Sequence, residues 1–523
     1  MKKEKLDYRN NWQLAVCSWS YAVGSIRLVM DGKVRQSVNI FLRHYLFPLW
    51  RGQGRGFLVL LIMLLTIPLS AQIEKSKTVE KTFDLGTNGI VKVDHRYGLL
   101  KVIQSKDGKV HLNARMRVEG SNEGDIQKAL NEFDMDINEF GSQVSIETDL
   151  GIKNWHGRNG KINLTFSNGT KVKGLKRLTA ELLLEVPDLK SLDLKNKYED
   201  IIIDQHLKGD LDVTIYDGDL QAQNVGGEVT LDIKYGKAVF GDIQNADLTL
   251  YDSKMEIELG KNIRIASKYS EYTVGDTESL KIKAYDDKME LGNIKGKFTM
   301  TDKYSEVELG NFGEAILDIY DADFVGKKGG KLTIDGSKYS KYRFTEIEDC
   351  EIDESYDDKF IIRSAKGLSI NRTKYSEFDL DQISENLEIS YSYDDKFSVE
   401  SLESLDVGET KYTEYEIGNL SGEIKVDDSH DDKVDVRKVA TSFKGLTLDG
   451  KYTKVYLDIP SSVKYILDAS MKYGSLEYPE DSFEDNYYKE KDSVLEVKGK
   501  IKGAGADAPK IEVRGHDCKV DLN

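Results

Sequence analysis

One short phrase recurs sixteen times between Tyr198 and Tyr473, at spacings of 16 to 22 residues. A period this regular is typical of repeat proteins, in which each unit stacks on its neighbours. The phrase has two alternating versions. The first is K-Y-S-E-Φ-x-Φ, where Φ is apolar, and its copies contain Tyr269, Tyr304, Tyr339, Tyr375 and, with Thr for Ser, Tyr412. The second is Y-D-D-K-Φ-x-Φ, and its copies contain Tyr285, Tyr356 and Tyr393.

Each unit holds two short stretches in which apolar and polar residues alternate. Leu368 and Ile370 precede one phrase, for example, and Phe378 and Leu380 follow its first residues. Alternation with period two predicts β-strands, and glycines such as Gly310 suit the corners between them. One unit cannot bury its own apolar face, whereas stacked units can. The sequence therefore predicts an all-β fold, a right-handed single-chain β-solenoid with about 16 rungs of 16–22 residues.

The spacing divides the chain into three regions. Residues 1–71 are interpreted as an N-terminal extension and signal peptide, residues 72–196 as a β-rich lead-in or cap, and residues 197–523 as the solenoid. The lead-in is less regular and contains the only clear helical pattern, at residues 123–133. A repeat array needs a polar cap at its end, and we expect the lead-in to provide it.

An apolar run at residues 57–69 contains no charge. It is shorter than the roughly 20 residues of a membrane span but fits a signal peptide. Small residues follow it, so cleavage is predicted between Ala71 and Gln72, with an uncleaved anchor as the alternative. The first 50 residues are unusual for a signal peptide, and either an early start codon or a cytoplasmic extension would explain them. The mature chain is expected to be exported, at the cell surface, in the periplasm or outside the cell, with no membrane span.

The chain is acidic, with a formal net charge of −17, and loss of residues 1–71 would make it more so. Such a surface repels nucleic acid, so no nucleic-acid partner is expected. The three cysteines, Cys17, Cys350 and Cys518, lie far apart in sequence. They form no disulfide framework, and Cys350 and Cys518 fit apolar positions of strands as buried thiols.

No catalytic motif is present, whether a zinc-protease helix, a nucleophile elbow, a phosphate-binding loop or a dinucleotide fingerprint. The histidines are scattered, and carboxylates are so frequent that no pair stands out as an acid and base. The sequence therefore predicts no enzyme and no catalytic, cofactor-binding or metal residues. A β-helix polysaccharide lyase is the enzymatic alternative, since such enzymes assemble sites from separate rungs.

The two versions of the phrase align with an offset, so that Tyr216 takes the place of Lys303. One column of the solenoid should alternate Lys with Tyr, and the next should alternate Tyr with Asp. By parity, Tyr285, Tyr356 and Tyr393 should lean inward, whereas Tyr304, Tyr339 and Tyr375 should be more exposed.

These tyrosines and aspartates allow three interpretations, of which a structural aromatic ladder is the first. A platform for sugar rings is the second, formed by Tyr269, Tyr304, Tyr339, Tyr375 and Tyr412. A calcium ladder is the third, formed by Asp286 and Asp287, Asp357 and Asp358, and Asp394 and Asp395, although a Lys follows each pair.

Three stretches, residues 90–102, 178–203 and 511–522, carry a resemblance to the bacterial putative-adhesin β-solenoid family. The first stretch resembles the opening strand pair of that family. The second resembles its pattern of a strand, the dipeptide V-P, a further strand and the first repeat. The third resembles its closing rung. The resemblance covers about residues 75–523, but Ser305, Asp287 and Glu199 stand where the family usually has Gly. It implies an exported, non-enzymatic, structural or adhesin-like protein, with a cell-surface glycan or protein as partner and no binding residues to carry over.

Overall fold

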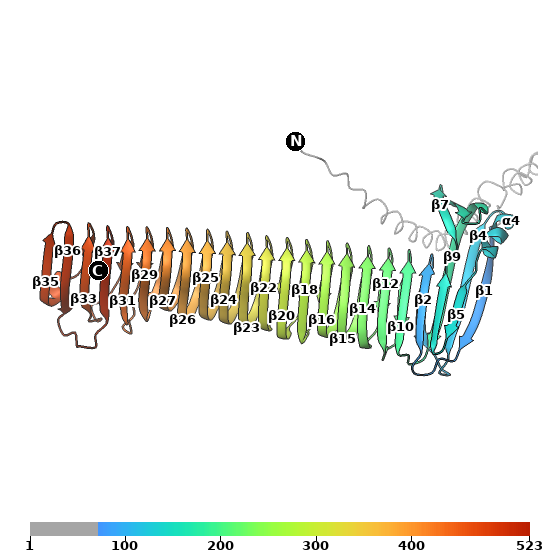
Figure 1. Ribbon diagram of the computed structural model, residues 1–523, viewed down its shortest axis with the longest axis horizontal. Coiled ribbons are helices and arrows are strands. Elements are labelled where there is room, and N and C mark those ends of the chain that lie inside the picture. Colours follow the sequence, from blue (N-terminus) through green and yellow to red (C-terminus); the bar gives the residue numbers. More distant parts are fainter. Residues whose placement is uncertain (1–71) are drawn as a thin grey trace, which may run out of the picture. The chain divides into compact units, whose positions relative to one another are not determined.

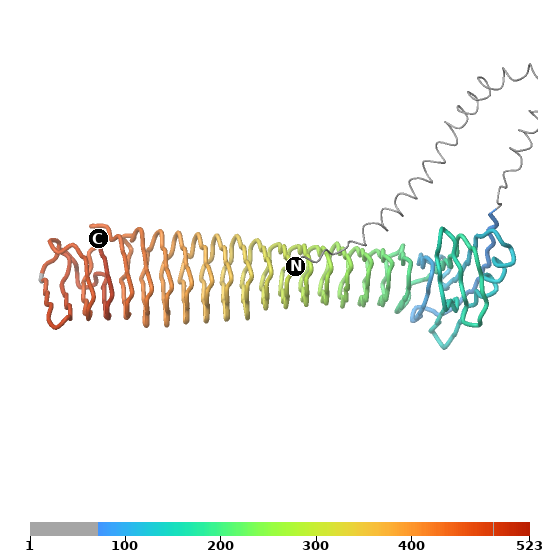
Figure 2. The backbone as a smooth tube through the Cα atoms, turned by 90° about the horizontal axis from the view of Figure 1, so that it is seen from above, coloured from blue at the N-terminus to red at the C-terminus, as the bar shows by residue number. Residues whose placement is uncertain are grey.

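The computed structural model describes residues 72–523, and this part of the chain is mostly β-strand. The strands stack into a β-solenoid of about 15 turns, which confirms the predicted fold class (Figure 1). Figure 2 shows the same stretch as a coil of successive turns, from the green to the orange part of the chain. The predictions made for residues 1–71, including Ala71 at the cleavage site and the apolar run, lie outside the described residues.

Strands β24 (Lys341–Tyr356) and β25 (Lys359–Lys374) show how one turn lies on the next. They pair in parallel, with Tyr342 opposite Phe360 and Ile352 opposite Ile370. Successive side chains of a strand point to opposite faces, so the apolar residues of both turns enter the interior together. The chain therefore buries a continuous core only by stacking equivalent residues of consecutive turns.

A column of aromatic rings runs through this interior. The rings stack face to face, with centroids 4.5–5.2 Å apart and interplanar angles of 2–11°. They belong to Tyr342, Phe360, Phe378, Phe397 and Tyr415, which are at most 2% exposed. Offset or parallel ring contacts of this kind add to the stabilisation that comes from burial alone.

Each turn consists of a short strand, a bend and a longer strand, which merge into one element in several turns. The first strands of the repeat are β10 (Ser191–Lys197), β11 (Ile201–Asp204), β12 (Asp210–Tyr216), β13 (Leu220–Ala222), β14 (Val225–Lys234), β15 (Lys237–Tyr251), β16 (Lys254–Lys268), β17 (Glu271–Val274), β18 (Ser279–Tyr285), β19 (Lys288–Leu291) and β20 (Ile294–Lys303). They are followed by β21 (Glu306–Leu309), β22 (Phe312–Tyr320) and β23 (Asp323–Lys338). After β24 and β25 come β26 (Glu377–Tyr393), β27 (Lys396–Lys411), β28 (Glu414–Leu420), β29 (Glu423–His430), β30 (Lys433–Val436), β31 (Gly445–Lys451) and β32 (Lys454–Leu457).

The N-terminal end is closed by antiparallel strands and one helix. Strand β4 (Val110–Gly120) lies between β1 (Ile73–Phe83) and β9 (Lys171–Val186) and is antiparallel to both. Helix α4 (Glu123–Asn131), which matches the expected helical pattern, buries Ile126 and Leu130 and contacts these strands. The helix begins at the Asn122 side chain, which accepts the backbone N–H of Asp125. The cap therefore replaces an open edge with antiparallel pairs.

Residues before the repeat also contribute a turn to the solenoid. Strands β2 (Ile90–Arg96) and β3 (Leu100–Gln104) pair in parallel with β10 and β11. The other strands of this region are β5 (Asp136–Phe140), β6 (Gln143–Thr148), β7 (Ile152–Arg158) and β8 (Lys161–Phe166). The parallel stack thus starts within the lead-in segment.

At the C-terminal end the order of strands in space departs from their order in the chain. Strand β37 (Lys510–His516) lies between β31 and β33 (Ile466–Lys472) and is parallel to both. Strand β38 (Lys519–Asp521) likewise lies between β32 and β34 (Ser475–Glu477). The end is covered by the antiparallel strands β36 (Val494–Ile501) and β35 (Phe483–Lys491), which the 3-10 turn Glu480–Ser482 precedes. The last turn of the sequence is therefore an internal turn of the structure.

Candidate functional site

One corner of the solenoid is built by two positions that alternate in identity from turn to turn. The first position is the last residue of the longer strand, where Tyr285 pairs with Lys303 and Lys303 with Tyr320. The second is the next residue, which has a left-handed backbone: φ is 70° at Tyr304 and 54° at Asp321. The structure confirms the predicted offset, because the first column alternates Lys with Tyr and the second alternates Tyr with Asp.

The tyrosines of both versions meet in one continuous ladder of rings. From Tyr198 to Tyr412 each ring contacts the next edge to face, with centroids 5.3–6.1 Å apart and interplanar angles of 78–89°. This geometry suits the quadrupoles of the rings. At its N-terminal end the ladder continues to Tyr97 and Trp155, and at its other end to His430, Tyr452, His516 and Tyr473.

The ladder tyrosines are partly exposed, and their exposure corrects one expectation. Tyr304, Tyr339 and Tyr375 are 43–44% exposed, but Tyr356, which was expected to lean inward, is also 36% exposed. The predicted order of exposure holds, since Tyr285 and Tyr393 are half-buried. The prediction that Tyr356 leans inward is wrong, because alternation stops at the left-handed residue Asp357 that follows it. Tyr356 and Asp357 both face outward, between Ser355 and Asp358, which are buried.

The structure places all five proposed platform residues on this ladder. Each is separated from the next by a tyrosine of the other version, so the exposed rings form a single stripe rather than a separate set. Tyr97, Trp155 and His516 also belong to the ladder, although they were not predicted as members. The pattern Y-G before Leu99 and the pattern H-D-C-K at the C-terminus were the available signals, because they place an aromatic ring before a corner.

Lysines of the first column lie over neighbouring rings. The Nζ of Lys197 is 4.8 Å from the ring centroid of Tyr198 and 5.1 Å from that of Tyr216. Lys411 and Lys472 lie 4.9 and 5.1 Å from the rings of Tyr412 and Tyr473. These are cation–π distances, so the lysines hold the rings as well as flanking them.

A buried polar column runs directly beneath the corner and explains why the two versions alternate. The carboxylate of Asp358 accepts the N–H of Ser340 in the preceding turn at 2.7 Å and the hydroxyl of Ser355 at 2.7 Å. The N–H of Asp358 in turn donates to the hydroxyl of Ser376 in the following turn at 3.2 Å. An inward Asp and an inward Ser therefore satisfy each other's backbone N–H groups from one turn to the next.

The same arrangement recurs at Asp287, Asp395 and Asp432, which are at most 5% exposed. Asp395 accepts the N–H of Ser376 at 2.7 Å and the hydroxyl of Ser392 at 2.6 Å. Burial raises the pKa of each of these carboxyls, to about 6 for Asp395. Asp302 is a further buried carboxyl whose pKa burial raises to about 6, and its Oδ2 has no hydrogen-bond partner among residues 72–523.

This geometry also bears on the proposed calcium ladder. The first Asp of each pair faces outward, as Asp286, Asp357 and Asp394 do, while the second faces the interior and binds N–H and O–H donors. The two carboxylates of a pair consequently do not converge. Over residues 72–523, no three His, Cys, Asp or Glu side chains are grouped to hold a metal ion.

No protein-family model matches the chain, and no curated protein sequence matches it significantly. A crystal structure of a putative adhesin from Bacteroides fragilis is similar to 58% of this chain, over 96% of its own length, with 13% identity and a TM-score of 0.17. A putative cell adhesion protein from Clostridium sporogenes is similar to 86% of this chain, over 99% of its own length, with 10% identity and a TM-score of 0.13.

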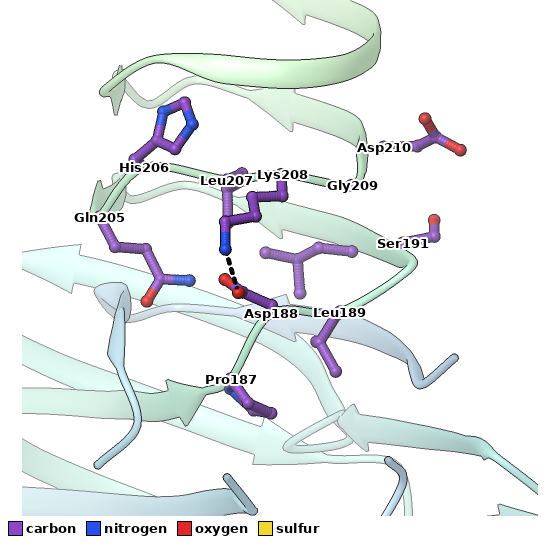
Figure 3. A pocket seen from close by; sticks show the side chains of 11 residues that line it. Pro187, Asp188, Leu189, Ser191, Gln205, His206, Leu207, Lys208, Gly209 and Asp210 are labelled. Carbon is purple, nitrogen blue, oxygen red and sulfur yellow. Dashed lines mark hydrogen bonds and ion pairs between the residues drawn. The ribbon is translucent and has the colours of Figure 1, made fainter. Parts of the chain in front are cut away.

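The hollows of the surface are shallow or small. The one in Figure 3 lies where the lead-in meets the repeat and is lined by residues including His206, Lys208 and Asp188. Lys208 Nζ is 2.6 Å from Asp188 Oδ2, so the cation is already paired there.

Cys350 and Cys518 are buried free thiols, and burial raises the pKa of Cys350 to about 12. Among the described residues, no helix is long and apolar enough to cross a membrane.

Proposed function

We propose that the protein is an exported, non-enzymatic solenoid that serves as a structural or adhesin-like element at the cell surface or in the periplasm. The observation that carries this proposal is the unbroken ladder from Trp155 to Tyr473, in which every ring contacts the next. Both the ladder and the buried column beneath it join consecutive turns. Most of the distinctive residues of the repeat thus maintain a long regular surface.

Export is supported by the apolar run at residues 57–69 and by the small residues that follow it. N-terminal sequencing of the protein recovered from outside the cytoplasm tests this part. It should begin at or near Gln72, and a start before Arg51 in that material would contradict export by cleavage.

The adhesive role is tested by expressing the full chain in a non-adherent bacterial host and measuring attachment to glycan-coated and protein-coated surfaces. We expect attachment that the empty host lacks. The triple variant Tyr304→Asn, Tyr339→Asn and Tyr375→Asn tests whether the ladder rings contribute to attachment. Asn is chosen because it tolerates a left-handed backbone while the ring is removed. Cleavage of an acidic polysaccharide by the purified protein, with or without calcium, would instead favour a lyase.

A glycan-binding module is the second candidate, and the exposure of the ladder rings favours it. Tyr269, at 46% exposed, and Tyr412, at 43%, mark the ends of the proposed platform. A glycan array with the exported protein tests it. Binding that the triple Asn variant loses, at a nearly unchanged melting temperature, would support a platform, whereas an array without any bound glycan would leave the ladder a purely structural feature.

A further inference from the structure

The charge of the molecule is unevenly distributed along the sequence. Residues 151–180 contain seven Lys and Arg and no Asp or Glu, whereas residues 181–523 contain 74 Asp and Glu against 46 Lys and Arg. A strongly basic segment in a strongly acidic chain creates a local positive potential that attracts anions. This segment forms β7, β8 and the start of β9 in the N-terminal cap, where β7 projects beside β9 (Figure 1).

The register of these three strands brings the basic residues onto one face. Arg158 pairs with Lys161 across the β7–β8 hairpin, and Thr165 pairs with Lys171 across β8 and β9. Lys173 follows Lys171 by two residues and so points to the same side. The opposite side carries Leu164 and Phe166, which are buried. We call the outward side, with Arg158, Lys161, Lys171 and Lys173, the basic face.

The basic face differs from most of the charged surface of the solenoid. In the solenoid, lysines face carboxylates of the adjacent turn, as Lys359 does Glu377 at 2.9 Å and Lys254 does Glu271 at 2.5 Å. The four cations of the basic face have no ion-pair partner within residues 72–523, although Lys176 nearby pairs with Glu119. Like charges directly opposite each other, as at Arg158 and Lys161, destabilise a sheet unless an anion compensates them.

We propose that the basic face binds an anionic polysaccharide. The four cations would contact its acidic groups, and the exposed Asn154 and half-buried Thr165 between them would bind sugar hydroxyls. The face carries no large apolar side chain to enter a membrane. Its aromatic ring is the exposed imidazole of His156, which lies opposite Asn163, whereas Trp155 points to the other side and stacks on Tyr97. The face therefore offers no row of rings on which successive bases of a single-stranded nucleic acid would stack. The choice of a polysaccharide over other polyanions rests on the proposed export.

The test measures binding of the exported protein to polygalacturonate, with neutral dextran as the control ligand. We expect binding that weakens with salt and is absent for dextran. The variant Lys161→Gln with Lys171→Gln and Lys173→Gln should bind at least about tenfold more weakly. The corresponding triple change to Arg should retain binding. A matched triple change to Gln at Lys281, Lys295 and Lys327, which are also exposed and have no ion pair among the described residues, should have no effect.

Several results would overturn the proposal. The first is unchanged binding of the basic-face variant to polygalacturonate. The second is that the unchanged protein binds single-stranded DNA or phosphatidylglycerol vesicles more tightly than polygalacturonate. The third is self-association of the unchanged protein at low salt that the variant abolishes. The last result would show that the basic face binds the acidic solenoid of a second copy. If the triple Asn variant of the ladder loses polygalacturonate binding while the basic-face variant retains it, the ladder is the binding site. This proposal then fails, while the adhesin proposal stands.

Discussion

At the scale of single residues, the corner depends on a backbone conformation that residues other than Gly rarely adopt. Tyr304, Tyr339 and Tyr375 have φ values of 59–70°, and Asp286, Asp357 and Asp394 have φ of 56°. A left-handed backbone costs an L-residue roughly 1–2 kcal/mol. In this fold, ring contacts outside offset that cost, and hydrogen bonds of the inward Asp and Ser add to the offset at the turns that contain them.

The buried carboxyls make stability depend on pH, and Asp302 gives the clearest prediction. Its pKa is raised to about 6 by burial, so protonation favours the folded state. Its contribution is fully present below the unfolded pKa of about 4 and is lost as the pH rises through 6. Asp302→Asn should therefore stabilise the protein above pH 6, by on the order of 2–3 kcal/mol, and change little near pH 4.

Urea unfolding at pH 4 and at pH 8 measures this difference. Asp318→Asn is the matched control, because Asp318 is exposed and lies on the next turn. If the Asp302→Asn variant is less stable than the wild type at pH 8, Asp302 is not a buried carboxyl whose Oδ2 lacks a hydrogen-bond partner, and the prediction fails.

The inner and outer aromatic rings should respond differently to removal. Tyr342 is fully buried and stacks on Phe360 at 4.8 Å, so Tyr342→Ala should cost about 3–5 kcal/mol. Tyr339→Asn removes a half-exposed ring and leaves a residue that suits the left-handed corner, so its cost should be less than half as large. Chemical denaturation of both variants checks the order. Equal losses would show that the outer ladder contributes as much as the core column.

At the scale of elements, the sequence was sufficient to predict the strands, the corners and the offset between the two versions. Period-two runs such as Leu368 and Ile370 led directly to buried strand positions, because burial follows alternation within a strand. It was not sufficient to predict the direction of Tyr356, because a left-handed residue interrupts alternation. Trp155 was also missed, since its contact with Tyr97 joins residues far apart in sequence.

The position of β37 could not be read from the sequence either. Residues 511–522 resemble a final rung, and parallel pairing alone does not say which two neighbours a rung lies between. In the structure this segment separates β31 from β33, and its backbone pairs with both. Within residues 72–523, the strands of the C-terminal cap therefore pair with the solenoid through β37 and β38.

Removal of residues 502–523 should consequently disrupt more than the segment that is removed. Strand β33 would lose its parallel partner β37, and the cap, in which β33 pairs with β36, should detach. Hydrogen exchange should show fast exchange at residues 466–501 and little change before residue 430. Retained protection of residues 466–501 would show that β33 pairs directly with β31 when β37 is absent. Removal of Asn523 alone is the control.

At the scale of the whole molecule, the solenoid is a stack whose stability is nearly a sum of turns and of contacts between neighbouring turns. The alternation adds a constraint, because an inward Asp needs an inward Ser or Thr above and below it. The outer rings also require the alternation, because each ring of the first column contacts rings of the second column in the turns above and below it. Complete pairs of turns should therefore be exchangeable or removable, whereas single turns should not.

Two internal deletions test this central claim most directly. Deletion of residues 304–338 removes two turns and joins Lys303 to Tyr339, which restores the alternation. Deletion of residues 304–320 removes one turn and joins Lys303 to Asp321, which leaves one corner without a ring. Thermal unfolding should show a cooperative transition close to that of the full chain for the larger deletion, and a transition several degrees lower for the smaller one. A single-turn deletion as stable as the two-turn deletion would contradict the role assigned to the alternation.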